Sequence, residues 1–201
     1  MLNMTSNCPI IGGQKWNGYL AEFVKTELQS SGLWDGIFYD NTWQDVTWFT
    51  QDSADSDLDN KPDIGLDESW RAGYRFLFTE TRRLVGSSFL VVGNMGPGHK
   101  HYRDQLNGAM LELFPQFGWP YAMSMYDYQS RGQDNKILII NGSTPTSTQA
   151  DYQHMRFTLS SALLGDGYFS YDLGSRHAEL WWYDEYGLDL GAAKTGPQAV
   201  G

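Results

Sequence analysis

The chain has 201 residues, of which 41% are hydrophobic and 15% are aromatic, and this composition is typical of a globular protein rather than a disordered one. Its 24 acidic residues outnumber the 14 basic ones, giving a net charge of −10, which argues against a nucleic-acid partner because that affinity depends on Lys and Arg. The single Cys8 allows no internal disulfide, and no stretch approaches the ~18 consecutive apolar residues of a membrane span.

The first residues of the chain do not have the pattern of a secretion signal. Met1–Thr5 lacks both a basic start and a long apolar stretch. We therefore expect no signal peptide in this chain. A strongly negative protein suits secretion, so an extracellular or periplasmic location is favoured for the parent protein, with its signal outside this chain.

The first part of the chain predicts a helix, a strand and a second helix. Apolar side chains recur at helical spacing over Trp16–Leu28, and Gly32 is suited to end that helix. The continuous apolar run Gly36–Asn41 is typical of a strand buried on both faces. A second helical stripe covers Trp70–Leu84, for which Asp67 is the predicted N-cap.

The middle of the chain predicts three further strands and one helix. Two apolar runs, Phe89–Asn94 and Ala109–Phe114, resemble the first one. Pro120 fits the first turn of a helix, because its missing N–H has no helical partner there. Ile137–Gly142 is the next strand-like run.

The last part of the chain predicts a helix, a strand and a linker. Thr146 and Gln149 have the spacing of a capping box, and Gly165 is suited to end the helix that follows. The run Tyr168–Asp172 predicts another strand. Gly191–Gly201 is small and polar, as in a loop or linker.

Alternation of strands and helices predicts a parallel α/β domain over residues 1–190. A (β/α) barrel and a doubly wound sheet both have this alternation. A doubly wound nucleotide-binding sheet needs a glycine-rich turn between a strand and a helix. Gly93–Gly98 is the nearest candidate, but it lacks the dinucleotide spacing and the Lys-Ser/Thr pair of a P-loop. The barrel is therefore favoured.

Polar and acidic residues stand where the apolar runs end, which in parallel barrels is the end that carries the active site. These residues are Asp40 and Asn41, Asn94, Glu112, Asn141 and Asp172. Turn formation is the alternative reading, and it explains Asn141 well. It explains Glu112 poorly, since Glu is no turn former and Leu stands on both sides. We predict that Asp40 and Glu112 are functional carboxylates, against the alternative that they hold neighbouring loops together.

Two carboxylates that face each other across a sugar are the apparatus of glycoside hydrolysis, in which one stays ionised and the other protonates the leaving oxygen. The expected partner is an oligosaccharide or polysaccharide, with no cofactor required, since the negative charge suits a neutral or cationic ligand. The predicted substrate-binding residues are Asn41, Trp43, Asn94, Asn141, Asp172, Trp182 and Asp184. The alternative function is a non-catalytic carbohydrate-binding protein that uses the same groove and a Trp/Tyr rim.

Four carboxylates in one acidic stretch have a spacing that could converge on a hard cation. They are Asp55, Asp57, Asp59 and Asp63. An EF-hand does not fit, because Asn60 replaces the turn glycine and Leu66 stands where a bidentate Glu belongs. A shorter calcium loop and a solvated acidic loop are the two remaining alternatives.

Several segments resemble a family of bacterial glycoside hydrolases with a TIM-barrel catalytic domain, and the resemblance covers nearly the whole chain. The segments are Gly32–Asn41, Asn107–Pro115, Ser161–Asp172 and Trp181–Tyr186. The resemblance implies a (β/α)8 fold of which about strands 3 to 8 are present, with Leu2–Thr5 ending the third strand. The chain is then a segment of a longer protein, or a partner or second copy fills the gap.

The same resemblance implies roles for the carboxylate pair. Counting strands in this way places Asp40 at the end of strand 4 and Glu112 at the end of strand 6. That placement is similar to the α-galactosidase clan of retaining enzymes. It implies that Asp40 is the nucleophile and Glu112 the general acid/base.

Overall fold

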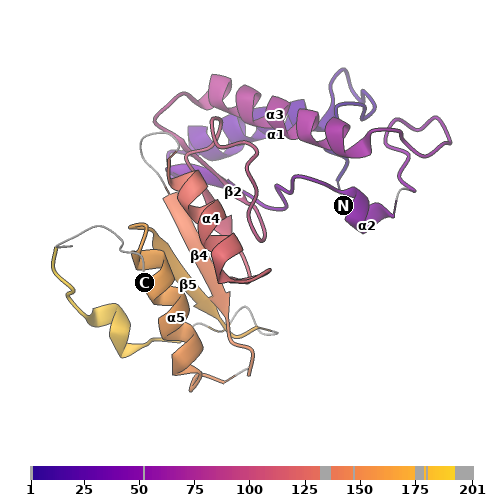
Figure 1. Ribbon diagram of the computed structural model, residues 1–201. Coiled ribbons are helices and arrows are strands. Elements are labelled where there is room, and N and C mark those ends of the chain that lie inside the picture. The colour runs from indigo at the N-terminus through magenta and orange to yellow at the C-terminus, as the bar shows by residue number, and fades with distance from the viewer. Residues whose placement is uncertain are drawn as a thin grey trace.

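The computed structural model describes residues 2–51, 53–131, 137–146, 148–174, 179 and 181–192. Its strands form one parallel sheet in which spatial order follows chain order (Figure 1). The strands are β1 (Gly36–Tyr39), β2 (Leu90–Asn94), β3 (Gly108–Leu111), β4 (Ile137–Ser143) and β5 (Tyr168–Asp172). The predicted parallel α/β architecture is confirmed, and this five-stranded sheet lacks the reversal of strand order at which doubly wound sheets bind nucleotides.

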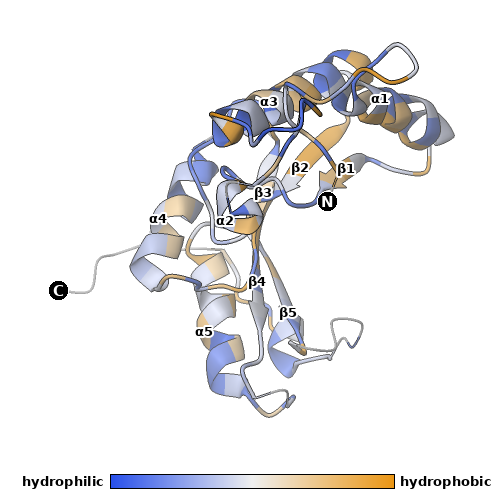
Figure 2. Ribbon diagram, turned by 90° about the vertical axis from the view of Figure 1, so that its right-hand side faces the viewer, coloured by the Kyte–Doolittle hydropathy of each residue, from blue (hydrophilic) through white to orange (hydrophobic). Residues whose placement is uncertain are grey.

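Helices alternate with the strands along the chain. They are α1 (Trp16–Phe23), a π-helical turn η1 (Val24–Leu28), the 3-10 turn η2 (Gln29–Ser31), α2 (Thr47–Thr50), α3 (Leu66–Val85), α4 (Trp119–Ser130), α5 (Tyr152–Leu163) and the 3-10 turn η3 (Asp184–Gly187). The helix α1 packs on α3, α4 contacts β3 and β4, and α5 contacts β4 and β5. Figure 2 shows α4 and α5 on the same side of the sheet. Among the described helices, none combines the length and apolar character that a membrane crossing requires.

The two faces of the sheet differ in burial, because side chains alternate between them along each strand. On one face, Leu138 and Ile140 of β4 are buried in a cluster with Tyr126 of α4. On the opposite face, Phe38 of β1 is 43% exposed and Tyr168 of β5 is 61% exposed. The sheet is therefore covered by helices on one face and is partly open on the other.

Two predicted helix ends are confirmed and one N-cap is wrong. Gly32 adopts a left-handed conformation directly after η2, and Pro120 lies in the first turn of α4. However, α3 begins at Leu66 after Gly65, and Asp67 does not cap it. Its carboxylate instead accepts hydrogen bonds from the backbone N–H groups of Val46 and Thr47, at 2.7 and 2.9 Å.

The contact of Asp67 ties α2 to α3. Burial would raise the pKa of the Asp67 carboxyl, but the hydrogen bonds from Val46 and Thr47 and the charge of Arg71 bring the pKa below its ordinary value. The N–H groups at the start of a helix have no partner within the helix. At the start of α2 they are paired with the carboxylate of Asp67, which is distant in sequence, rather than with a local cap.

The predicted capping box at Thr146 and Gln149 is also wrong. The helix α5 begins later, at Tyr152, and the residue before it, Asp151, makes no side-chain cap. The segment before α5 forms its own hydrogen bonds instead: the hydroxyl of Thr144 accepts the N–H of Thr146 at 3.3 Å and donates to the carboxylate of Asp151 at 3.2 Å.

The N-terminal residues do not form the strand implied by the resemblance. The described residues of Leu2–Thr5 belong to no strand. Met4 is buried against Gly73 of α3, and the N–H of Ser6 donates to the carbonyl of Ser69 at 2.8 Å. This segment therefore bonds to α3, and the outer edge of β1 has no strand partner among the described residues. Of the predicted linker, residues 193–201 lie outside the described part of the chain.

Candidate functional site

The polar residues at the strand ends lie on the open face of the sheet. Asn94 of β2 pairs in register with Met110, and Glu112 lies two residues farther along, hence on the same face. Asn141 of β4 pairs with Ser170, and Asp172 lies two residues beyond that on the same face. Parallel register therefore brings these strand-end residues to one end of one face.

Asn94 joins the two predicted carboxylates directly. Its side-chain Nδ2 donates to Oδ1 of Asp40 at 2.9 Å and to Oε2 of Glu112 at 3.0 Å. Its Oδ1 accepts the N–H of Gly96 at 3.0 Å, which fixes the orientation of the amide. Two oxygens bonded to one nitrogen can be at most about 6 Å apart.

Asp40 is solvent-exposed and further held by its neighbour. The backbone N–H and the side-chain amide of Asn41 donate to the Asp40 carboxylate, at 2.8 and 3.1 Å. Asn41 has a left-handed backbone, and its carbonyl accepts the hydroxyl of Tyr74 at 2.9 Å. Burial, followed by the neighbouring Tyr102 and Asp40, raises the pKa of Tyr74, so this hydroxyl stays a donor at neutral pH. The turn that presents Asp40 is thus fixed from α3.

Glu112 is the first residue after β3, which corrects the predicted strand over Ala109–Phe114. The strand ends at Leu111, Glu112 is half-buried, and Leu113 is 50% exposed with a left-handed backbone. The N–H of Glu112 donates to the carbonyl of Gly96 at 2.8 Å. The carboxylate is therefore carried at a strand end, rather than inside an apolar strand.

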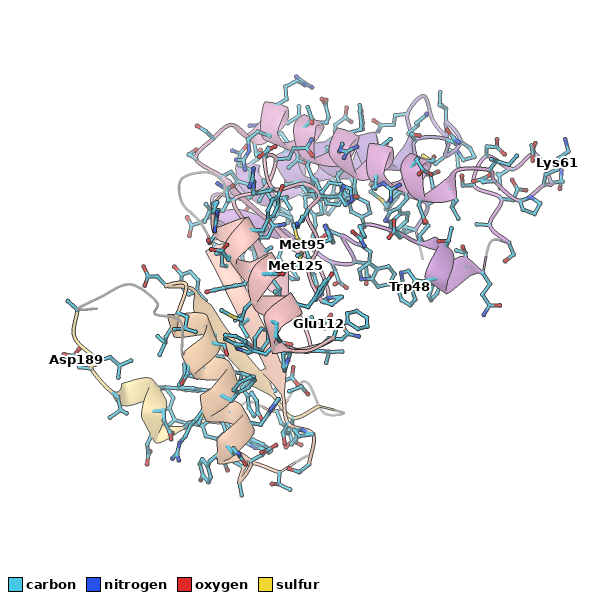
Figure 3. All side chains as sticks on the ribbon, viewed as in Figure 1. Trp48, Lys61, Met95, Glu112, Met125 and Asp189 are labelled. Carbon is cyan, nitrogen blue, oxygen red and sulfur yellow. The ribbon has the colours of Figure 1, made fainter. Side chains whose placement is uncertain are left out.

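A hollow of about 400 Å³ opens beside Glu112. Its walls come from the loops after β1, β2 and β3 and from α4, and they include Trp43, Trp48, Phe117 and Tyr121. The rings of Trp43 and Trp48 meet edge to face at 4.8 Å. Figure 3 shows Trp48 on α2 and Glu112 next to α4, on the side toward Trp48. Of these four aromatic residues, only Trp43 was predicted from the sequence as a binding residue. The adjacent aromatic residues Trp48 and Phe49 are the sequence feature that could have indicated Trp48.

The residue His99 connects the loops that form this hollow. It is 4% exposed, its Nε2 lies 2.8 Å from the carbonyl of Thr42, and its Nδ1 accepts the N–H of His101 at 3.2 Å. Burial lowers the pKa of His99 to about 4, despite the hydrogen bond to Thr42. The imidazole is therefore neutral at neutral pH, with Nε2 as the donor.

Residues 2–201 match the model of the hypothetical glycosyl hydrolase family 15. The chain belongs to this family. The family description supports the expectation of a glycoside-hydrolase-like protein. A search of curated proteins found no match.

In this member of the hypothetical glycosyl hydrolase family 15, a second set of hydrogen-bonded side chains lies at the same end of the sheet. The side-chain amide of Asn141 donates to Ser170 at 3.3 Å and to Asp172 at 3.2 Å. Asp172 also accepts the N–H of Gly174 at 2.9 Å. The substrate-binding role of Asn141 and Asp172 stays a prediction, and the geometry places both on the open face.

Trp182 and Asp184 are not brought to the carboxylate pair. Asp184 begins η3, and Trp182 is 68% exposed with its ring against Tyr186. Tyr183 between them packs on Tyr152 of α5. In Figure 3, Asp189, just beyond η3, lies on the opposite side of α5 from Glu112. The segment covers α5 and does not line the hollow, so a sugar-binding role for Trp182 and Asp184 stays a prediction without a contact to the pair.

Three of the four predicted metal-binding carboxylates lie together. One oxygen each from Asp55, Asp57 and Asp63 fall within 4.8 Å of one another. Asp59 lies outside this group, and its Oδ1 accepts the N–H of Lys61 at 2.9 Å. The carboxylates of the group also accept backbone N–H bonds, such as that of Asn60 to Asp55 at 2.9 Å. Calcium binding stays a prediction from the spacing.

Proposed function

We propose that this chain is the catalytic part of a retaining glycoside hydrolase, with Asp40 as nucleophile and Glu112 as general acid/base. The observation that carries the proposal is the shared hydrogen-bond donor Asn94. This donor places the nearest oxygens of the two carboxylates within about 6 Å of each other, which is compatible with the ~5–5.5 Å between the carboxyl groups of retaining enzymes. Membership of a family described as glycosyl hydrolases supports the reaction class.

The proposed reaction has two displacements. In the first, Asp40 attacks the anomeric carbon, the bond to the leaving oxygen breaks, and Glu112 transfers its proton to that oxygen. In the second, Glu112 takes a proton from water, the water oxygen attacks the anomeric carbon, and the ester bond to Asp40 breaks. Asn94 orients both carboxylates throughout, since its own oxygen is fixed by Gly96.

The fold we propose is a (β/α)8 barrel that this sheet forms in part. Sequential parallel strands with helices on one face are the arrangement of a barrel wall. The open face with Phe38 and Tyr168 would then face the barrel interior, and further strands would cover the edges of β1 and β5. Those strands come from a longer chain or from a second copy. Size-exclusion chromatography with light scattering distinguishes them, because a stable, folded monomer rules out the second copy.

The catalytic proposal is tested with a panel of aryl glycosides. Wild-type protein should hydrolyse at least one of them, and Asp40→Asn and Glu112→Gln should each lower the rate by about 10²-fold or more. The control is Asp189→Asn, which changes an exposed Asp on the far side of α5 and should leave the rate unchanged. Activity that survives both site substitutions contradicts the assignment.

A non-catalytic carbohydrate-binding protein is the second candidate, favoured by the exposed aromatic wall beside Glu112. It predicts glycan-array binding that survives Asp40→Asn, with no hydrolysis of any bound glycan. Loss of binding in Trp182→Ala would assign that role to the segment on α5; loss in Trp48→Ala would assign it to the hollow.

A further inference from the structure

The hollow beside Glu112 touches one member of the carboxylate pair. Glu112 lines it together with Trp43, Trp48, Phe117 and Tyr121, whereas Asp40 is not among its lining residues. Asn94 separates the two carboxylates. The space therefore extends from Glu112 in a direction that does not include Asp40.

We propose that this hollow is the subsite for the leaving group and that it takes a neutral sugar ring. The inference rests on the proposed function. In a retaining mechanism, the sugar whose bond is broken must reach both carboxylates, and the leaving oxygen lies next to the acid. A space that contacts Glu112 and not Asp40 cannot hold the first sugar, and it lies where the group beyond the leaving oxygen must go.

The charges around the hollow favour a neutral occupant. Among the described residues, no Lys or Arg lines the hollow. Asp45, which does line it, forms an ion pair with Arg71. His99 is buried, and its low pKa keeps it neutral. A phosphate or a sugar acid would find no cation among the described lining residues to balance its charge.

The aromatic walls suit the apolar face of a sugar ring. Trp48 is 63% exposed and Phe117 is 73% exposed, so neither ring is buried in the hydrophobic core and both can contact a ligand. Large exposed aromatic side chains that gather at a hollow indicate a binding surface rather than packing.

Hydrogen bonds within the protein fix the position of Trp48 in the absence of a ligand. The indole Nε1 of Trp48 donates to the carbonyl of Asp45 at 3.0 Å. The start of α2 is fixed by the hydrogen bonds from Val46 and Thr47 to Asp67. Since little ordering is needed on binding, more of the stacking free energy becomes affinity.

The test compares two leaving groups on the same sugar. A glycosyl fluoride releases fluoride, which leaves the hollow empty, whereas a disaccharide must place its second sugar there. The probes are the α- and β-fluorides of glucose and galactose, with maltose, cellobiose, melibiose and lactose as the matching disaccharides. The variants are Trp48→Ala and Phe117→Ala. The matched control is Trp34→Ala, because Trp34 is also 60% exposed but precedes β1, at the other end of the sheet.

We expect Trp48→Ala and Phe117→Ala to lower kcat/KM by about tenfold for the disaccharide and to leave the fluoride within about twofold. Trp34→Ala should change neither. An equal loss for both leaving groups overturns the inference while leaving the proposed function intact.

Failure of the wild type to hydrolyse any of the eight probes is a different result, and it overturns the proposed function and the leaving-group role together. In that case, isothermal titration calorimetry with the same disaccharides tests whether the hollow binds a sugar. Binding that Trp48→Ala weakens and Trp34→Ala does not supports the neutral-sugar site; equal binding in all three proteins contradicts it.

Discussion

The carboxylates of Asp40 and Glu112 accept hydrogen bonds from the same nitrogen, Nδ2 of Asn94, at 2.9 and 3.0 Å. A single amide that donates to both side chains holds the two carboxyl groups at a fixed separation and orientation. Asn94 is 4% exposed, so its own amide is held in the protein interior. It is a positioning residue on which the geometry of the pair depends.

Replacing Asn94 by Asp should therefore reduce hydrolysis strongly. The substitution keeps the side-chain size, but it removes both hydrogen bonds and adds a carboxylate next to Asp40. We expect kcat to fall by about 10²-fold, the usual cost of losing one well-placed donor. The control is Asn7→Asp, the same change at an exposed position. Steady-state kinetics that show equal effects for the two variants would contradict the positioning role.

The two carboxylates should differ in their dependence on the leaving group. Fluoride needs little protonation to depart, so Glu112→Ala should keep most of the first displacement on a glycosyl fluoride while losing about 10²-fold on a disaccharide. Asp40→Ala removes the nucleophile and should fail on both. Pre-steady-state measurement of fluoride release checks this. The opposite pattern would exchange the two roles.

The buried His99 predicts a loss of stability in acid. Burial lowers its folded pKa to about 4 from an ordinary value of 6.5, so the unfolded chain takes up a proton in this interval that the folded chain does not. Stability from this group is complete above pH 6.5 and falls as the pH drops towards 4, by about 3 kcal/mol in total. His99→Gln keeps a donor for Thr42 but does not titrate, so its stability should fall less between pH 7 and 4.5. Parallel curves for the two proteins in denaturant titrations would contradict this reading.

Two helical glycines should respond to alanine in opposite ways. A Cβ at Gly73 of α3 would lie 1.6 Å from the carbonyl oxygen of Met4, whereas at Gly18 of α1 the nearest atom is 3.8 Å away. Alanine favours a helix over glycine by about 1 kcal/mol. Gly18→Ala should therefore raise the free energy of unfolding, and Gly73→Ala should lower it by displacing Met4. Thermal or chemical unfolding of the two variants measures both, and stabilisation by Gly73→Ala would be inconsistent with the close approach of the N-terminal segment.

The strands could be predicted from the sequence because each is a short apolar run, and the positions of Asp40 and Glu112 followed from where those runs end. The bridge through Asn94 could not be predicted, since it depends on the register between β1, β2 and β3. The hollow was missed for a similar reason: its walls come from loops that are distant in sequence. The N-cap at Asp67 failed because a tertiary contact with α2 replaced the local one.

The most direct test of the central claim is to trap the glycosyl-enzyme with a 2-deoxy-2-fluoroglycosyl fluoride whose sugar matches the best substrate. The fluorine at C1 leaves as fluoride when the ester to the enzyme forms, and the fluorine at C2 slows hydrolysis of that ester. The labelled residue can then be identified by mass spectrometry of the peptides. We predict that the label is on Asp40, that Glu112→Gln can still be labelled and that Asp40→Asn cannot. A label on another residue, or product of inverted configuration with no label, would contradict the assignment.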